Sequence, residues 1–210
     1  MNKPETFENA ALRFPTIDDG VKIGHVHLKV ADLQRALDFY CGVLGFTMTT
    51  SRPGAAFISA GGYHHHIGLN TWESRGGSPP APGTTGLYHT AILYPTRRLL
   101  ADALRRLIAA KIPLEGASDH GVSEALYLRD PDDNGVELYW DRPKEMWPKR
   151  EDGGLRMFTN PLAICAICWR SWIRRRADDF QSSPSLPMGI QHGKLAFRCT
   201  ARCLLVPTGT

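Results

Sequence analysis

A chain of 210 residues with 42% hydrophobic and 22% charged residues is typical of an ordinary water-soluble globular protein. No run approaches the roughly 20 apolar residues that a membrane span requires, and the N-terminal segment lacks the basic-then-apolar pattern of a secretory signal. We therefore expect a cytoplasmic protein that does not associate with membranes.

The net charge of +4 comes from the end of the chain. Residues 1–150 hold 17 basic and 17 acidic residues, whereas residues 151–210 hold 8 basic and 4 acidic residues. A neutral front part gives no support for a nucleic-acid-binding groove, so we expect no nucleic-acid partner.

The first regular elements follow a polar lead-in, residues 1–20. Residues 23–30, IGHVHLKV, alternate as a half-buried strand does, and residues 31–46, ADLQRALDFYCGVLGF, have the spacing of an amphipathic helix. Asp32 is the expected N-cap, and a glycine at 42 or 45 can end the helix. Residues 55–60 and 64–70 are then predicted to be strands around a Gly-Gly turn.

The same order then repeats. After a loop at residues 73–86, LYHTAILY (87–94) is another alternating strand, and RRLLADALRRLIAAK (97–111) is a helix. Its predicted apolar face consists of Leu100, Ala103, Leu104, Leu107 and Ile108. EALYL (124–128) and VELYW (136–140) are strands joined by the turn RDPDDNG. The repeat predicts two modules, each a curved sheet with one helix on its core side.

Histidines stand on the faces turned away from the helices. Strand alternation puts His25 and His27 opposite Val26 and Leu28, while His89 opens the second module. In the triplet 64–66, His64 and His66 are predicted to face the cleft and His65 the other side. Tyr127 and Glu137 are predicted to share the second cleft face. Two or three imidazoles and one carboxylate from separate strands can form a facial metal site with open positions.

Three segments resemble a known superfamily: GHVHLKVADLQRALDFYCGVLGF, GLYHTAILYP and LYLRDPDDNGVELYW. They are similar to the vicinal-oxygen-chelate superfamily of glyoxalases, bleomycin resistance proteins and dioxygenases. Within it, they most resemble extradiol ring-cleaving dioxygenases of the catechol 2,3-dioxygenase type. The resemblance implies an α+β fold in which two βαβββ modules, about 21–72 and 87–142, form one domain over 21–148.

The resemblance also implies a site and a reaction. The metal ligands would be His25, His89 and Glu137, binding Fe(II) or alternatively Mn(II). Tyr127, ten residues before Glu137, matches the substrate-binding tyrosine of the family. His66 matches the acid–base histidine from the end of the first module. The substrates would be a small aromatic diol and O2.

Several alternatives stay open for individual residues. His27 lies on the same face as His25 and could replace it as the ligand, and His64 could take the role of His66. His120, in a predicted loop, either covers the mouth of the cleft or is merely exposed. The sequence is also compatible with a homodimer, because paired modules complete a cleft either within a chain or across two chains.

Other functions within the superfamily are alternatives. A glyoxalase-like isomerase or lyase usually uses a fourth ligand, often glutamate, near the end of the first module, where this chain has HHHIGLN without a carboxylate. A thiol transferase of the fosfomycin-resistance kind has a similar His, His, Glu set. A metal-free small-molecule-binding resistance protein needs only a hydrophobic cleft.

The tail, residues 149–210, is predicted to be irregular. The resemblance fades near Ala163, and we expect the structured part to end near residue 160. Four cysteines, Cys165, Cys168, Cys199 and Cys203, form two close pairs there. Such pairs can bind zinc, but the segment between them lacks clear periodicity, so the zinc site is an open alternative.

Overall fold

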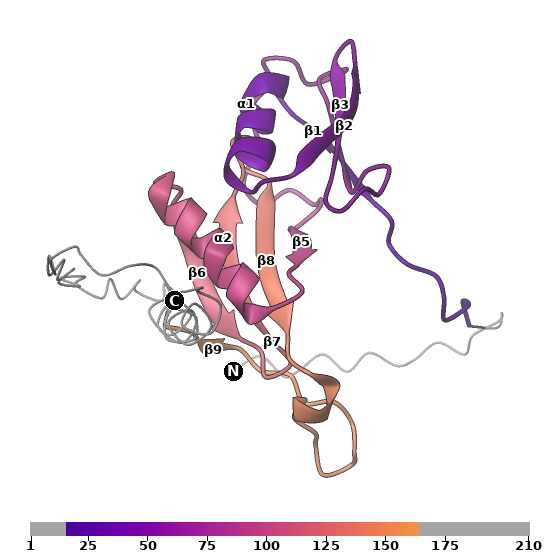
Figure 1. The fold of residues 1–210 in the computed structure, drawn as a ribbon, viewed down its shortest axis with the longest axis vertical. Coiled ribbons are helices and arrows are strands. Elements are labelled where there is room, and N and C mark those ends of the chain that lie inside the picture. The colour runs from indigo at the N-terminus through magenta and orange to yellow at the C-terminus, as the bar shows by residue number, and fades with distance from the viewer. Residues whose placement is uncertain (1–15, 164–210) are drawn as a thin grey trace, which may run out of the picture.

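The computed structural model describes residues 16–163. Its first module forms a four-stranded sheet with the strand order β1-β4-β3-β2, in which β1 and β4 are parallel. The elements in chain order are β1 (Val26–Lys29), α1 (Leu33–Leu37), the π-helical turn η1 (Asp38–Val43), β2 (Thr47–Arg52), β3 (Ala55–Ser59) and β4 (Ile67–Asn70). Figure 1 shows the helix lying beside the strands of this module.

The second module repeats this plan in a five-stranded sheet with the order β5-β8-β7-β6-β9, and β5 is parallel to β8. Its elements are β5 (Thr90–Leu93), α2 (Arg97–Ala109), β6 (Leu114–Asp119), β7 (Ser123–Arg129), β8 (Gly135–Asp141), the short helix η2 (Lys144–Met146) and β9 (Asn160–Pro161). The predicted α+β fold with a strand–helix–strands repeat is confirmed.

Local signals explain where the helices begin and end. The Asp32 carboxylate accepts a hydrogen bond from the Arg35 backbone N–H at 2.9 Å, as an N-cap does. Thr96 caps α2 in the same way through the Leu99 N–H. The first helix ends at Gly45, whose φ of +89° is readily adopted only by glycine.

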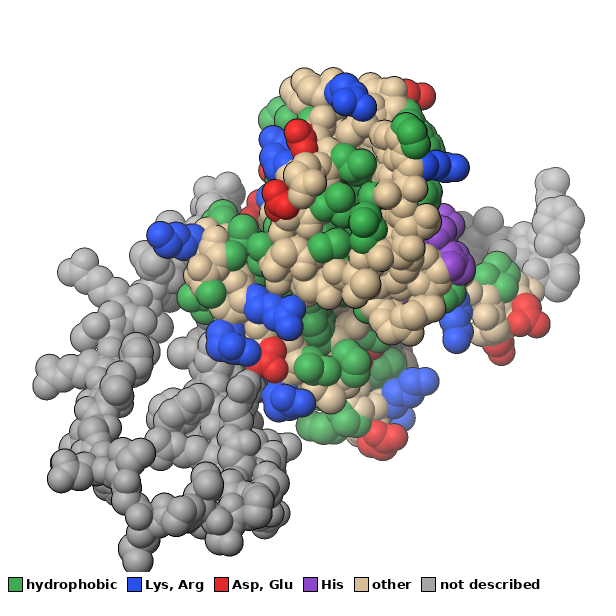
Figure 2. Space-filling model, turned by 45° about the horizontal axis from the view of Figure 1, so that its top comes forward, with side chains coloured by type: hydrophobic (Ala, Val, Ile, Leu, Met, Phe, Trp, Pro, Cys, Tyr) green, Lys and Arg blue, Asp and Glu red, His purple; other side chains and the backbone are tan. Residues whose placement is uncertain are grey.

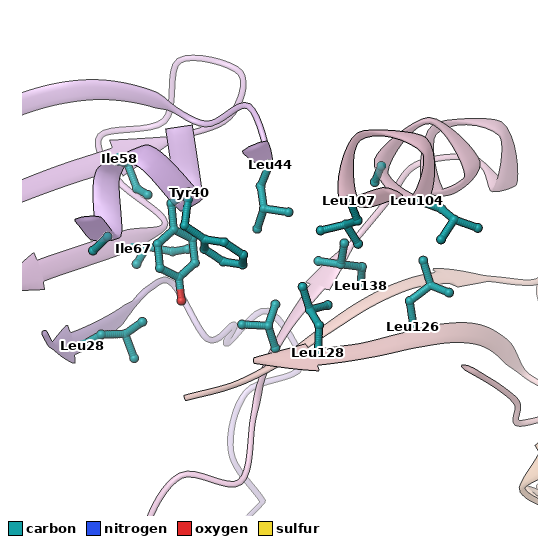
Figure 3. Close-up of a cluster of buried hydrophobic side chains, with 14 of the residues drawn as sticks. Leu28, Tyr40, Leu44, Ile58, Ile67, Leu104, Leu107, Leu126, Leu128 and Leu138 are labelled. Atoms are coloured by element: carbon teal, nitrogen blue, oxygen red, sulfur yellow. The ribbon is translucent and has the colours of Figure 1, made fainter. Parts of the chain in front are cut away.

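One hydrophobic core joins the two modules. Leu28, Tyr40, Leu44, Ile58 and Ile67 of the first module share a buried cluster with the second module (Figure 3). The members from the second module include Leu100, Leu104, Leu107, Leu126, Leu128, Val136 and Leu138. The helix-side residues of both sheets thus supply the core, as the alternation predicted.

The turn between β7 and β8 ties the modules together through two buried carboxylates. Asp130 accepts a hydrogen bond from the buried Tyr40 hydroxyl at 3.0 Å. Asp132 accepts from the Ala31 backbone N–H at 3.0 Å and from the Arg35 guanidinium. Because burying these groups without partners would be costly, the turn fixes the first module against the second.

The structure corrects several boundaries. Strand β4 begins at Ile67, so the histidine triplet precedes the strand and does not belong to it. Strands β2 and β6 were not assigned from the sequence pattern, and Ile108, predicted on the apolar face of its helix, is 56% exposed. Between 149 and 163, where an irregular tail was predicted, β9 pairs with β6. The four tail cysteines lie outside the described residues.

None of the helices within residues 16–163 combines the length and apolarity that a bilayer crossing demands.

The link between the modules predicts a cost for removing one hydroxyl. Tyr40→Phe leaves the buried Asp130 carboxylate without its partner from the first module, so the free energy of unfolding should fall by about 1–2 kcal/mol. Urea unfolding followed by circular dichroism measures this value. The matched control is Tyr63→Phe, because Tyr63 is 41% exposed. Equal stability of Tyr40→Phe and the unchanged protein would contradict the role of this contact.

Candidate functional site

The best-defined polar cluster lies on the second sheet, on the face opposite α2. His89 directly precedes β5, which runs parallel to β8, and this pairing brings its imidazole to Glu137. The His89 Nε2 atom lies 2.9 Å from Glu137 Oε2, and the Glu137 side chain is only 13% exposed. The other ring nitrogen of His89, Nδ1, is buried and has no hydrogen-bond partner among the described residues.

Tyr127 extends this pair across the sheet. It is the register partner of Glu137 in the antiparallel β7–β8 pair, so the two side chains project from the same face. The Tyr127 hydroxyl donates to Glu137 Oε1 at 3.2 Å. Burial, the Glu137 charge and this hydrogen bond raise the pKa of Tyr127 to about 12, so the phenol keeps its proton at neutral pH.

His120 completes a chain of four side chains. It follows β6, and its Nε2 lies 2.6 Å from the Tyr127 hydroxyl oxygen. Its Nδ1 lies 3.0 Å from the carbonyl oxygen of Phe158, in the segment that leads into β9. The sequence placed His120 in a loop with an open role, and the structure brings it into direct contact with Tyr127.

The Tyr127 hydroxyl has one hydrogen and two neighbours that can accept it, Glu137 and His120. The Phe158 carbonyl only accepts, so the short contact with His120 Nδ1 needs a proton on that nitrogen. If Tyr127 donates to Glu137, then His120 Nε2 must also carry a proton and the ring is a cation. If the His120 ring is neutral, the Tyr127 hydroxyl donates to His120 Nε2. The contact between Tyr127 and Glu137 then has a hydrogen only if Glu137 is protonated.

An ion-pair network braces the turn that carries His120. Arg142 donates to both oxygens of Asp119, at 2.6 and 3.1 Å, and to Glu124 at 3.0 Å. The Arg142 hydrogen bonds hold the pKa of the Asp119 carboxyl below its ordinary value. Gly121 has a φ of +77°, and a Cβ there would lie 2.7 Å from the Phe158 ring. The turn therefore requires glycine next to His120.

A second glycine allows His89 to approach the sheet. A Cβ on Gly135 would lie 2.1 Å from the Tyr88 carbonyl oxygen and 3.0 Å from the His89 Cβ. Backbone atoms cannot move away as a flexible side chain can, so Gly135 is needed for this approach. Sequence reasoning missed Gly135, Arg142 and Phe158. The glycine that ends the turn RDPDDNG was a usable signal, whereas nothing local marks Phe158.

The first-module histidines form a separate group. The ring of His25 contacts that of His65, with 4.4 Å between centroids, and His65 contacts Phe57 at 5.1 Å. The Nδ1 atoms of His64 and His65 lie 2.7 Å apart. Figure 2 shows histidine side chains gathered at one edge of the molecule. His65 thus shares the side of His25, contrary to the predicted alternation, because residues 64–66 precede the strand.

His66 is anchored within the same region. Its Nδ1 accepts from the Ala60 backbone N–H at 3.3 Å and lies 3.0 Å from the Ser59 hydroxyl oxygen. A neutral ring with an accepting Nδ1 carries its proton on Nε2. His27 contacts the rings of Phe57 and Trp72, and burial, followed by the charges of His25 and Arg52, lowers the pKa of His27.

Side chains of both modules carry donor atoms of the kind that bind a metal ion. His89 Nε2 and Glu137 Oε2 lie 2.9 Å apart, close enough for both atoms to ligate one ion beside them, and Nδ1 of His89 has no hydrogen-bond partner among the described residues. His25, the third predicted ligand, makes its ring contact with His65 on the other sheet. Within residues 16–163, no three His, Cys, Asp or Glu side chains are grouped to hold a metal. Two predicted ligands fit, and the third is not assembled with them.

The sequence is similar to those of known dioxygenases. The sequence is 41% identical over 149 residues to the catechol-2,3-dioxygenase of Bacillus subtilis, covering 71% of this chain and 52% of that protein. It is 34% identical over 126 residues to the biphenyl-2,3-diol 1,2-dioxygenase 3 of Rhodococcus globerulus, covering 57% of this chain and 63% of that protein. The chain therefore spans roughly half to two thirds of the length of these relatives.

A solved structure supports the fold. A glyoxalase/dioxygenase from Nostoc punctiforme superposes with a TM-score of 0.51 at 21% identity, covering 61% of this chain and 98% of that one. The family model of the Glyoxalase/Bleomycin resistance protein/Dioxygenase superfamily matches residues 22–138, from before β1 of the first module into β8 of the second. The chain belongs to the Glyoxalase/Bleomycin resistance protein/Dioxygenase superfamily.

Proposed function

We propose that this chain is a metal-dependent extradiol ring-cleaving dioxygenase that acts on a catechol-type aromatic diol with O2. The observation that carries the proposal is the continuous chain His89–Glu137–Tyr127–His120, which combines ligand-type and proton-transferring side chains. The two dioxygenases that resemble the chain support the same reaction class.

His89 and Glu137 are the side chains that would hold the metal, and the sequence resemblance adds His25 as the third ligand. The resemblance favours Fe(II), with Mn(II) as the alternative. A bound ion of this kind acts as a Lewis acid on the diol oxygens and lowers their pKa. An ion bound by both His89 and Glu137 would also neutralise a largely buried carboxylate that lies beside a phenol.

Tyr127 and His120 would manage a proton beside the substrate. Because the pKa of Tyr127 is raised to about 12, its hydroxyl remains a hydrogen-bond donor at neutral pH. Such a donor can orient a substrate oxygen instead of Glu137. His120 contacts the same hydroxyl and can take up or return one proton through it.

His66 is the second candidate for proton transfer, and it rests on the family resemblance. Its ring orientation is fixed by Ser59 and Ala60, which leaves Nε2 as the free position. A fixed imidazole with one free nitrogen suits an acid–base group. The structure places His120, and not His66, in contact with Tyr127, so the two roles can be separated by mutation.

The direct test of the proposal is turnover. Protein loaded anaerobically with Fe(II) and then mixed with O2 and a panel of catechols should produce the yellow ring-opened product and consume one O2 per diol. Absorbance and an oxygen electrode measure both. No turnover of any diol, together with activity on a glutathione hemithioacetal, would contradict the dioxygenase and favour the isomerase.

Two carboxylate variants control this experiment. Glu137→Ala should lose metal and turnover together, because it removes a predicted ligand. Glu115→Ala removes a half-exposed β6 carboxylate that pairs with Arg129, and it should retain both. Full metal retention in Glu137→Ala would show that the ligand set is wrong.

A second pair of variants locates the proton handler. His66→Ala should keep the metal and lower turnover by ~10²-fold or more, the usual size of an acid–base contribution. His120→Ala should shift the pH dependence of turnover through its contact with Tyr127. Metal content and pH–rate profiles are the measurements. Loss of metal in His66→Ala would place His66 among the ligands instead.

The phenol of Tyr127 offers a test that is independent of turnover. Its pKa of about 12 depends on burial and on Glu137, so Glu137→Gln should move the titration midpoint to lower pH. The folded-state pKa of Tyr127 lies above the ordinary value near 10. The contribution of this phenol to the stability of the fold should therefore decrease as the pH rises from about 10 to about 12. NMR of Cζ-labelled tyrosine, assigned with Tyr127→Phe, measures the midpoint. An unchanged midpoint in Glu137→Gln would contradict the coupling.

A further inference from the structure

The internal repeat allows the two sheets to be compared position by position. In the first module Phe57 pairs with Gly68, and in the second Tyr127 pairs with Glu137. The parallel pairs Val26–Ile67 and Thr90–Val136 fix the same register for both modules. Gly68 therefore stands where the second module has Glu137, and Phe57 stands where it has Tyr127. The first module lacks the carboxylate and the phenol of the candidate catalytic site.

Four side chains of the first module form a group that we call the aromatic box: Arg52, Phe57, His27 and Trp72. The Arg52 guanidinium lies 5.2 Å from the Phe57 ring centroid and 5.4 Å from that of Trp72. The His27 ring lies 5.8 Å from Phe57 and 5.5 Å from Trp72. Each member thus contacts two others, and the four close into a ring on the sheet face opposite α1.

The backbone is shaped to hold this box. A Cβ on Gly68 would lie 2.9 Å from atoms of the His27 ring, so the imidazole packs directly against a bare backbone position. Trp72 leans over the β2–β3 turn, where the Thr71 N–H donates to the Gly54 carbonyl at 2.9 Å. Arg52 ends the strand that leads into this turn. The glycine at position 68 therefore makes room for an aromatic surface where the second module has its carboxylate.

Charge indicates the kind of ligand. Within residues 16–163, Arg52 forms no ion pair, although two rings hold its guanidinium. A guanidinium stacked on aromatic faces keeps its edge N–H donors free for a planar acceptor such as a carboxylate. Lys29, on the same strand as His27, differs from Arg52 because it pairs with Glu73 at 3.5 Å. Trp72 is 56% exposed, so its ring is accessible to a ligand.

We propose that the aromatic box is a binding site for planar aromatic carboxylates. The carboxylate accepts two hydrogen bonds from the Arg52 guanidinium, and the ligand ring stacks on Trp72 and His27. A cationic ligand would compete with Arg52 for the same ring faces, whereas an anion uses the charge that is already there. The four members of the box all come from the first module and do not include His89, Glu137 or Tyr127, so the proposal does not rest on the proposed dioxygenase activity.

The test uses three probes of equal shape and different charge: benzoate, benzamide and benzamidine. Each is titrated into the full chain labelled with ¹⁵N, and the indole N–H resonance of Trp72 is followed after assignment by its loss in Trp72→Phe. Benzoate should shift this resonance in a saturable way and bind about tenfold or more tightly than neutral benzamide, as a charge-assisted hydrogen bond implies. Benzamidine should not bind.

Variants complete the design. Arg52→Gln should weaken benzoate binding about tenfold or more, and Gly68→Ala should weaken it by displacing His27. The control Arg105→Gln also removes one positive charge, but from the exposed side of α2, and should leave binding unchanged. Glu137→Gln should retain benzoate binding even if it abolishes turnover. Equal binding of benzamidine and benzoate, or full benzoate binding by Arg52→Gln, would overturn the proposal.

Discussion

Two buried carboxylates in the β7–β8 turn hold the two modules together. Asp130 and Asp132 can remain buried because the first module supplies their donors, Tyr40, Ala31 and Arg35. The same turn sets the register of β7 and β8, and that register places Tyr127 opposite Glu137. The contact between modules and the geometry of the candidate site are therefore consequences of one hairpin.

The two modules have the same topology but different chemistry on their sheet faces. The second module pairs an imidazole with a carboxylate and a phenol, and it leaves one nitrogen of His89 without a partner. The first module has a glycine in place of the carboxylate and surrounds it with rings and a guanidinium. The same backbone plan thus presents an imidazole, a carboxylate and a phenol on one sheet face and aromatic rings with a guanidinium on the other, because a few positions in equivalent registers differ.

Much of the fold could be predicted, because an element that is buried on one face has apolar residues at regular intervals in the sequence. β1, α2 and the core-facing Leu126, Leu128 and Leu138 follow this period closely. β2 could not be recognised, because all its residues are exposed and carry no alternation. The predicted side of His65 was also wrong, because side chains alternate between two faces only inside a strand, and His65 precedes β4. Strand alternation predicted that Tyr127 and Glu137 share one face, whereas the contact of His120 with Phe158 joins segments 38 residues apart and leaves no local signal.

We propose that His89 and Glu137 of the second module bind the metal, and that the more conspicuous histidine triplet 64–66 of the first module does not. Mn(II) broadens NMR signals of nuclei close to it, so titrating Mn(II) into ¹⁵N-labelled protein locates the ion directly. If His89 and Glu137 bind the ion, the backbone signals of His89, Gly135 and Glu137 should broaden first. Broadening confined to residues 64–66, with the signals of His89 and Glu137 remaining sharp, would contradict it.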